Sequence, residues 1–256
     1  MKTTAAFAAV AFAFIFNAGS ALAQATTYEP TVGQDGKDVV WVPTPQMVVD
    51  RMLDMAKVTR QDFVMDLGSG DGRTVISAAK RGAQALGIEY NPDMVALSRR
   101  NAEKAGVSPE QARFEQADLF ETDFSKASVI TMFLLPDINL QLRPKILGLK
   151  PGTRVVSNTF TMGEWQPDAK ADLSSSCGAS YCNPLLWIVP AKVAGAYKIP
   201  AGDLVLKQDF QMLSGTLASG GRKVIVTGKV RGEDINFSAN GTDYHARLRG
   251  KNLELR

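Results

Sequence analysis

Hydrophobic residues recur along the chain with two different periods, and the period changes near Pro184. Before that residue, short apolar runs alternate with segments whose apolar residues repeat every three to four positions. The expected strands are 63–65, 85–88, 112–116, 129–133 and 155–156, and the expected helices are 47–56, 75–79, 94–105 and 138–149. Strands that alternate with helices form right-handed crossovers and a parallel sheet covered on both faces. The pattern therefore predicts a doubly wound, Rossmann-like α/β domain over residues 24–190.

Prolines and their neighbours predict where two of these helices begin or bend. Pro45 suits the first position of a helix, and Thr44 suits the capping position before it. Pro144 predicts a start or a kink inside the segment 138–149, because proline lacks the backbone N–H that a helix interior uses. A last strand over 185–189 completes the expected mostly parallel sheet.

Beyond Pro190 the apolar residues alternate with polar ones, which is the period of a strand with one buried face. Glycines at 215, 220, 221, 232 and 241 interrupt these runs and indicate hairpins. Residues 191–256 are therefore predicted to form a small antiparallel sheet or partial barrel, the C-terminal β unit. So small a unit buries little surface alone, so we expect it to pack on the first domain.

The N-terminus has the features of a secretory signal. Lys2 precedes an apolar run over 5–16, and small residues flank Leu22 in Ala21-Leu22-Ala23. The run is too short for a membrane span and ends at a signal-peptidase pattern. We expect cleavage after Ala23, a periplasmic or secreted protein, and no stable membrane span afterwards. An uncleaved anchor or a helix of the mature domain is the alternative.

The two cysteines, Cys177 and Cys182, lie in one Gly/Ser-rich segment. With an export signal, that arrangement favours a small disulfide. Two free thiols or half of a metal site are the alternatives. A metal site needs more ligands, and the only histidine, His245, is far away in an expected strand, so no metal is expected.

Composition changes this picture little. The chain has 256 residues, 45% hydrophobic content and a formal net charge of +3. These values are typical of a soluble protein with one substantial core. So small a net charge gives no electrostatic argument for nucleic acid, and we expect no nucleic-acid partner.

A glycine-rich turn joins the first expected strand to a helix. Its three glycines, Gly68, Gly70 and Gly72, are spaced G-x-G-x-G, whereas a dinucleotide site uses G-x-G-x-x-G. Asp66 stands at the strand end just before them. A carboxylate there repels a pyrophosphate but pairs with the ammonium group of S-adenosylmethionine (SAM). The spacing and the charge both favour SAM as the ligand.

Two further acids end the next two strands. Glu89 is placed to accept hydrogen bonds from the ribose hydroxyls, and Asp118 from the adenine amino group. Either acid alone would be an ordinary solvated strand-end residue, but the three acids in order follow one SAM molecule. Thr44, together with Trp41, is placed to close over it. The expected cofactor-binding residues are Thr44, Asp66, Gly68, Ser69, Gly70, Gly72, Glu89 and Asp118.

These motifs resemble the first three motifs of class I SAM-dependent methyltransferases over about residues 38–190. More narrowly, the chain is similar to the mitochondrial protein-lysine methyltransferases that modify the c subunit of ATP synthase, and to their bacterial relatives. That similarity rests on the stretches 42–45, 66–73, 87–92, 133–136, 152–157 and 165–167. It implies a protein substrate and N-methylation of lysine. The export signal and the C-terminal β unit depart from that family, and leave the substrate and the source of SAM open.

The acceptor side gives fewer signals. Phe133-Leu134-Leu135-Pro136 stands where other methyltransferases carry Asn-Pro-Pro-aromatic, a motif for nucleic-acid amino groups and glutamine amides. Its absence argues against those acceptors but leaves carboxylates, phenols and lipids open. No catalytic base identifies itself. Asp137 and Asn158 could touch the acceptor, although Asp137 also suits a capping role.

Phe160 and Trp165 are candidates for a substrate lip or for packing, and His245 has the features of an ordinary strand residue. An active methyltransferase is the first hypothesis, with a protein lysine as acceptor by resemblance. The alternatives are an exported SAM- or nucleoside-binding protein whose β unit binds a partner, and a methyltransferase acting on a small molecule or lipid. Under each of these hypotheses we expect the C-terminal β unit to govern partner choice.

Overall fold

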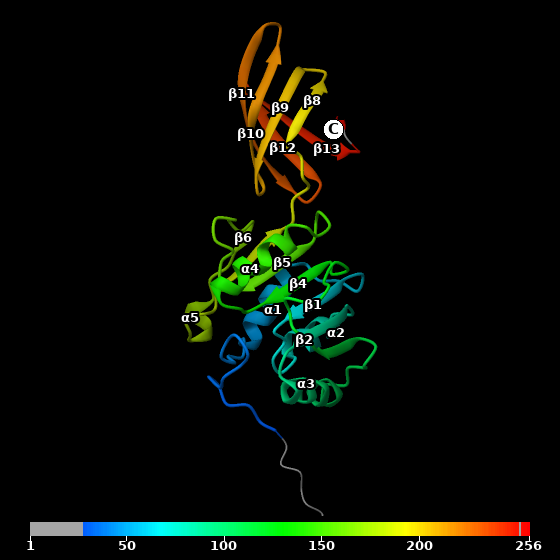
Figure 1. The fold of residues 1–256 in the computed structure, drawn as a ribbon, viewed down its shortest axis with the longest axis vertical. Coiled ribbons are helices and arrows are strands. Elements are labelled where there is room, and N and C mark those ends of the chain that lie inside the picture. The colour runs from blue at the N-terminus through cyan, green and yellow to red at the C-terminus, as the bar shows by residue number, and fades with distance from the viewer. Residues whose placement is uncertain (1–27, 251) are drawn as a thin grey trace, which may run out of the picture.

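The computed structural model describes residues 28–250 and 252–256. The expected signal segment, residues 1–23, lies outside the described residues. Of the helices within the described residues, none has both the length and the apolar character needed to cross a bilayer. Figure 1 shows two parts, an α/β part in the lower half of the view and a second sheet at the upper end of the molecule.

The first sheet has seven strands in the order β3-β2-β1-β4-β5-β7-β6. Strands β1 to β5 run parallel, β7 is antiparallel to β5, and β6 is antiparallel to β7. The mostly parallel, doubly wound fold is therefore confirmed. The strands are β1 (Phe63–Leu67), β2 (Gln84–Glu89), β3 (Ala112–Gln116), β4 (Val129–Met132), β5 (Arg154–Asn158), β6 (Ala169–Lys170) and β7 (Pro184–Ile188).

Helices cover both faces of this sheet. Val64 and Val129 point to one face, where they share a buried cluster with helices α1, α2 and α3. Met65 and Ile130 point to the other face, which α4 covers. The alternation follows from the two-residue period of a strand. The helices are α1 (Gln46–Met55), α2 (Arg73–Lys80), α3 (Pro92–Lys104), α4 (Pro136–Ile146) and the short α5 (Ser174–Cys177).

Two helices differ from what their prolines predicted. Helix α1 begins at Gln46, with Pro45 as the residue before it, and no side chain caps that end, so the capping role predicted for Thr44 is wrong. Helix α4 begins at Pro136 and continues through Pro144, which is neither a start nor an end. Pro144 lies in the last turn, where only one backbone hydrogen bond is lost. Strand β6 and helix α5, two and four residues long, were too short to predict.

The second sheet is a seven-stranded antiparallel meander in which each strand pairs with the next. Its edge strands β8 and β14 approach each other, so the sheet curls towards a barrel. An antiparallel β unit was predicted, but its two edge strands, β8 and β14, were not recognised. The strands are β8 (Gly195–Ile199), β9 (Gly202–Asp209), β10 (Met212–Ser219), β11 (Arg222–Arg231), β12 (Asp234–Ala239), β13 (Thr242–Arg249) and β14 (Asn252–Leu255).

One glycine of this sheet has a different role from the predicted one. Gly215 lies inside β10, opposite Leu206 and Val226, and not in a turn. A Cβ atom on Gly215 would lie 2.0 Å from the carbonyl oxygen of Val205. Gly215 therefore permits a close approach between strands, which is the other common reason for glycine in a strand. Gly220, Gly221, Gly232 and Gly241 lie in hairpin turns as predicted.

The second sheet packs against the first through a small set of contacts. The ring of Phe210 stacks on Trp165 with centroids 6.1 Å apart. Gln211 donates a hydrogen bond to the Gln166 carbonyl at 2.6 Å, and Lys229 pairs with the buried carboxylate of Asp168 at 2.8 Å. A Cβ atom on Gly232 would lie 3.1 Å from the Cα atom of Gly152, which precedes β5. The second sheet thus contacts the edge where β5 begins.

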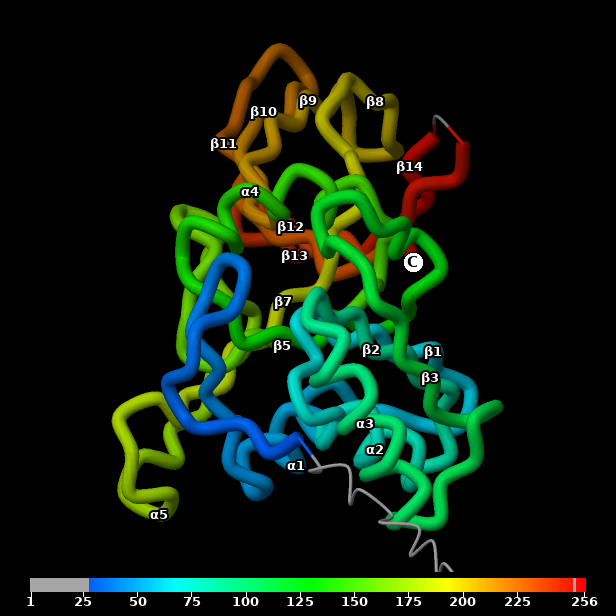
Figure 2. The backbone as a smooth tube through the Cα atoms, turned by 60° about the horizontal axis from the view of Figure 1, so that its bottom comes forward, coloured from blue at the N-terminus to red at the C-terminus, as the bar shows by residue number. Residues whose placement is uncertain are grey.

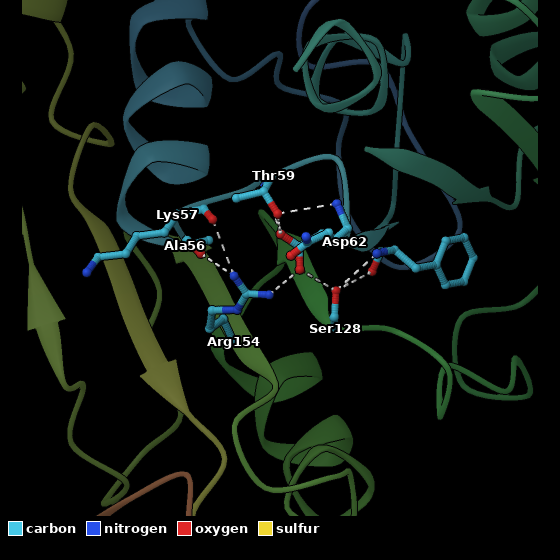
Figure 3. Close-up of polar contacts among 8 residues, drawn as sticks. Ala56, Lys57, Thr59, Asp62, Ser128 and Arg154 are labelled. Carbon is cyan, nitrogen blue, oxygen red and sulfur yellow. Dashed lines mark hydrogen bonds and ion pairs between the residues drawn. The ribbon is translucent and has the colours of Figure 1, made fainter. Parts of the chain in front are cut away.

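The beginning of the parallel strands is held by a network around Asp62, shown in Figure 3. Asp62 forms an ion pair with Arg154, the first residue of β5, and accepts a hydrogen bond from the Ser128 hydroxyl at 2.8 Å. Arg154 also donates to the Ala56 carbonyl at the end of α1, at 2.8 Å. The network joins α1 to the starts of three neighbouring strands, β1, β4 and β5, at the edge opposite their carboxyl ends.

Candidate functional site

A cavity of about 360 Å³ opens at the carboxyl ends of the parallel strands. This is the edge at which open α/β sheets bind ligands. Seven of the eight predicted cofactor residues line it, namely Thr44, Asp66, Gly68, Ser69, Gly70, Glu89 and Asp118. The eighth, Gly72, does not. The structure therefore brings the predicted acids and most of the glycine loop into one site.

Gly72 has a supporting role behind the loop. It caps α2 with a left-handed backbone, φ 83°. A Cβ atom there would lie 2.7 Å from the Phe114 ring and 2.9 Å from Ser98. Only glycine fits that space and that backbone conformation without strain. Gly72 lets α2 begin close against α3 and β3, and so fixes where the loop turns.

The glycine loop is also tied to its surroundings by hydrogen bonds. The N–H groups of Gly68 and Ser69 donate to the Ile88 carbonyl at 2.9 and 3.0 Å. Ser98 of α3 donates to the Gly70 carbonyl at 2.7 Å. These bonds hold the backbone of the loop in one conformation, so the cavity wall is preformed.

Glu89 is held in place by two backbone groups. Gly70 donates its N–H to one carboxylate oxygen at 2.9 Å, and Asn91 donates to the other at 3.0 Å. Each carboxylate oxygen has a further lone pair free to accept. Glu89 therefore presents fixed acceptor oxygens to the cavity, as a pair of ribose hydroxyls requires.

Asp66 is buried with 6% of its surface exposed. Its carboxyl accepts a hydrogen bond from the Thr131 hydroxyl at 2.6 Å. The pKa of Asp66 is raised to about 7, first by burial and then by the nearby charges of Asp71 and Glu89, against the lowering effect of the Thr131 hydrogen bond. A carboxyl with this pKa ionises readily when a cation comes next to it.

Asp118 is already engaged by a residue from the N-terminal side. Lys37 places its ammonium nitrogen 2.5 Å from Asp118 and 4.9 Å from the centre of the Tyr90 ring. The Phe120 N–H donates to the other Asp118 oxygen at 2.9 Å. The Lys37 hydrogen bond lowers the pKa of the Asp118 carboxyl. Asp118 is therefore an ionised acceptor at the cavity mouth.

Lys37 belongs to residues 34–44, the N-terminal strap, which lines one side of the cavity. The segment folds as a hairpin, in which Gly33 donates to the Trp41 carbonyl and Trp41 to the Gln34 carbonyl, and it is the blue loop before α1 in Figure 2. Trp41 lies over Gly70, where a Cβ atom would meet its indole nitrogen at 2.8 Å. Thr44 accepts from Arg73 through its carbonyl at 2.9 Å. The contribution of residues 34–40 to the cavity was not predicted, because the polar residues 34–38 show no hydrophobic period and Val39 and Val40 carry no polar side chain.

The acceptor candidates separate into two groups. Phe160 lines the cavity, whereas Trp165 is fully buried under Phe210 and forms no lip. Asn158 is also buried and donates to the Tyr181 carbonyl at 2.8 Å, so it holds a neighbouring loop. Asp137 lies in the first turn of α4, and the residue at the capping position is Leu135, so neither role predicted for Asp137 is found.

His245 lies in β13, far along the second sheet, with its ring nitrogen 2.6 Å from the Asn236 amide oxygen. Tyr181 also lines the cavity and was missed. The cue available in the sequence was its place between Cys177 and Cys182, which are paired as the sequence favoured. Among the described residues, no group of three His, Cys, Asp or Glu side chains is placed to hold a metal ion.

The residues present fit SAM. The Ser69 hydroxyl in the glycine loop is buried without a hydrogen-bond partner among the described residues. Such an unpaired polar group is rare unless a ligand or water completes it. The buried acid Asp66, the fixed acceptor Glu89 and the ionised Asp118 supply partners for an ammonium group, a ribose and an adenine amino group in that order.

Comparisons with known proteins agree with this chemistry. The family model for the ANTKMT methyltransferase domain matches residues 66–169. A protein-lysine N-methyltransferase of Saccharolobus islandicus is 48% identical over 132 residues, which cover 50% of this chain and 81% of that protein. The Mus musculus lysine N-methyltransferase named for the c subunit of ATP synthase is 40% identical over 129 residues, and the match spans about half of each protein.

A solved structure from Salinibacter ruber, described as an RNA methyltransferase in complex with S-adenosyl-L-homocysteine, is 47% identical. It superposes with a TM-score of 0.55 and covers 59% of this chain and 96% of its own. The similarity thus extends over nearly all of that protein, and its bound ligand is the demethylated product of SAM.

Proposed function

This chain belongs to the family of SAM-dependent methyltransferases that includes the ANTKMT domain, and from that premise we propose that it methylates the ε-amino group of lysine in a protein. The observation that carries the proposal is the 48% identity over 81% of a protein-lysine N-methyltransferase. The alternative of a SAM- or nucleoside-binding protein without catalysis is not favoured, because the family consists of transferases.

The acceptor side of the cavity suits an amine that must lose its proton. Phe133, Leu134, Leu135, Ile138 and Phe160 line it with apolar groups. An apolar surrounding disfavours the ammonium form and favours the neutral amine, which is the nucleophile. These five side chains bring no titratable group, so their role is to orient the amine and exclude water.

SAM supplies the reactive methyl group on a positively charged sulfur. On this chain, Asp66 would hold the ammonium end of the cofactor, Glu89 the ribose and Asp118 the adenine. The backbone of Gly68 and Gly70 provides a close, preformed wall between them. Asp66, Glu89 and Asp118 come from three neighbouring strands, so the sheet itself fixes their spacing.

A labelling experiment tests the acceptor class. The purified protein is incubated with SAM carrying a tritiated methyl group and with a protein extract, with ribosomal RNA in a parallel arm. Label that protease removes and nuclease spares, and that hydrolysis releases as methyllysine, supports the proposal. Label confined to RNA would overturn it. Glu89→Ala serves as the inactive variant, and Glu115→Ala, an exposed acid on β3, is the matched control.

We also propose that residues 1–23 are a signal peptide and that the mature protein is periplasmic or secreted. The charged start, the apolar run and Ala21-Leu22-Ala23 support this. The disulfide between Cys177 and Cys182 is of the kind that persists in oxidising compartments. Intact-mass analysis of protein from its native host should give a chain beginning at Gln24. A chain that retains Met1 to Ala23, with both thiols open to alkylation, would overturn this proposal.

A further inference from the structure

We propose that the loop closed by the Cys177–Cys182 disulfide, here called the disulfide loop, forms a wall of the acceptor pocket and that Tyr181 in it determines which side chain enters. The occupant we infer is an unbranched alkyl amine, the lysine side chain. This rests on the proposed function, and it assigns to the loop a specificity role that neither the fold nor the family match supplies.

The strand order divides the cavity into two halves. The acids lie at the carboxyl ends of β1, β2 and β3, while the aromatic residues Phe133 and Phe160 follow β4 and β5. Because β7 is antiparallel to β5, with Asn158 opposite Pro184, the residues just before β7 lie at the same edge. Tyr181 is there. The cofactor half and the aromatic half therefore lie side by side, with the methionine end at β1 nearest to the aromatics at β4.

The three aromatic rings make one continuous surface. Phe133 lies in the middle, with its ring centre 5.8 Å from that of Phe160 and 5.9 Å from that of Tyr181. The ring planes differ by only 19° and 28°. Phe133, Phe160 and Tyr181 all line the cavity that also contains Asp66. A side chain that enters beside this surface meets apolar carbon over its length.

The loop that carries Tyr181 is restrained from three sides. The disulfide closes it between Cys177 and Cys182. The buried amide of Asn158 donates to the Tyr181 carbonyl at 2.8 Å, and the Thr159 N–H donates to the Asn183 carbonyl at 3.0 Å. Cys182 is fully buried in the cluster beneath α1. These restraints fix the backbone that carries the Tyr181 ring.

The chemistry of the surface selects the occupant. A lysine side chain has four methylene groups, and each methylene that is buried adds roughly fourfold to affinity. The aromatic surface offers that contact and brings no carboxylate to bind a guanidinium group. The methylenes would lie along Phe133 and Tyr181, with the nitrogen directed towards the cofactor half.

A bisubstrate probe tests this without knowledge of the natural acceptor. The probe is an analogue of SAM in which nitrogen replaces the sulfonium sulfur and carries a 2-(butylamino)ethyl arm, so that an amine lies next to the cofactor half and four carbons lie beyond it. Its dissociation constant is compared with that of S-adenosylhomocysteine by calorimetry on the full chain. The ratio of the two constants is the arm gain, and its change from one variant to another measures the acceptor half, because the replacement of sulfur by nitrogen is common to all of them. We expect an arm gain of about tenfold or more in the wild type.

Three variants locate the origin of the arm gain. Tyr181→Ala should lose most of it, while S-adenosylhomocysteine binds within twofold of wild type, and Tyr181→Phe should retain it because the ring remains. Cys177→Ala combined with Cys182→Ala should lower it at least threefold by releasing the loop. Tyr244→Ala removes a tyrosine from a stacked pair in the second sheet and should change nothing.

The outcomes separate this inference from the proposed function. No binding of S-adenosylhomocysteine by the wild type would refute the methyltransferase site itself. Tight binding of S-adenosylhomocysteine with an arm gain that Tyr181→Ala leaves unchanged would overturn the role of Tyr181. An arm gain unchanged in the double cysteine variant would overturn the role of the disulfide. Thermal melting of each variant identifies any that fail to fold. Tyr181→Phe shows whether the arm gain comes from the ring of Tyr181 or from its hydroxyl group.

Discussion

Lys37 is hydrogen-bonded to Asp118 at 2.5 Å, at the position where the sequence predicts the adenine amino group. The same ammonium group lies over the Tyr90 ring and 6.0 Å from the centre of Phe120. The N-terminal strap therefore places its own cation on the acid expected to serve the cofactor. SAM and Lys37 then compete for one carboxylate.

This competition predicts that removing the Lys37 charge tightens cofactor binding. In Lys37→Met, no ion pair with Lys37 has to break before the adenine amino group binds Asp118. The dissociation constant of SAM should therefore fall by up to about fivefold, which corresponds to the free energy of an exposed ion pair. Calorimetry at moderate salt measures it. Lys80→Met, an exposed lysine of α2, is the control and should leave binding unchanged. Weaker binding in Lys37→Met would show that Lys37 helps to hold the cofactor.

The pKa of Asp66 predicts how cofactor binding depends on pH. With a pKa raised by burial to about 7, the Asp66 carboxyl is mostly neutral below that value and mostly ionised above it. Only the ionised form pairs fully with an ammonium group, so affinity should fall as pH decreases. The dissociation constant of SAM should be about tenfold higher at pH 6 than at pH 8. In Asp66→Asn it should be high and nearly flat over this range. A flat profile in the wild type would refute the role of Asp66.

The sequence allowed the chemistry of the cofactor half to be predicted because that chemistry is local. Asp66, Gly68 and Gly70 lie within five consecutive residues at one strand end, and Glu89 ends the next strand. Their spacing along the chain fixes their spacing in space, because successive parallel strands end at the same edge. The seven predicted residues that line the cavity lie at a strand end, in the turn that follows it, or beside the start of a helix.

Other site residues are placed by tertiary folding and could not be predicted. Lys37 reaches Asp118 across 81 positions of sequence from a segment without periodicity. Tyr181 reaches Phe133 because β7 reverses direction relative to β5, which apolar runs alone do not reveal. Gly215 was taken for a turn because a glycine that spaces two strands and a glycine that turns a chain look alike in sequence.

The Asp62–Arg154 pair predicts a loss of stability in acid. Burial raises the pKa of Asp62, but hydrogen bonds from Arg154, the Thr59 backbone and Ser128 outweigh it and hold the pKa below its usual value. A carboxylate with a lowered pKa stabilises the fold above its unfolded pKa, near 4, and this is lost as pH falls through the folded value. Asp62→Asn should lower the free energy of unfolding by about 1–3 kcal/mol at pH 7.

Urea unfolding from pH 7 down to pH 3 measures this effect. The difference between the wild type and Asp62→Asn should shrink as the wild-type carboxyl becomes protonated. Asp54→Asn is the matched control, because Asp54 also pairs with an arginine, Arg81 at 2.7 Å, but has 59% of its side chain exposed. An exposed pair contributes little, so that variant should lie within about 0.5 kcal/mol of wild type. Equal losses in the two variants would contradict the prediction.

The C-terminal β unit is predicted to act on acceptor choice and not on cofactor binding. Within the described residues, those that line the cavity all precede Asn183. The second sheet instead meets the edge where β5 begins, through Phe210, Lys229 and Gly232. On its outer face, register places Val205 beside Thr216, and Thr216 beside Ile225. Val205 and Ile225 are exposed apolar residues, with 45% and 77% of their surface accessible.

Acidic substitutions on the outer-face row formed by Val205, Thr216 and Ile225 test, in the full-length chain, whether the β unit acts on acceptor choice. Val205→Asp combined with Ile225→Asp should leave the dissociation constant of SAM within twofold, because the cavity lies at the opposite edge of the first sheet. Methylation of the protein acceptor should fall at least tenfold if the row docks it, since a buried unpaired carboxylate strongly disfavours association. Leu140→Asp, an exposed site on α4, controls for added charge.

A truncation ending near Ala191 gives the complementary result. If it folds, it should bind SAM and lose acceptor methylation. A folded truncation that loses SAM would instead make the β unit part of the active site.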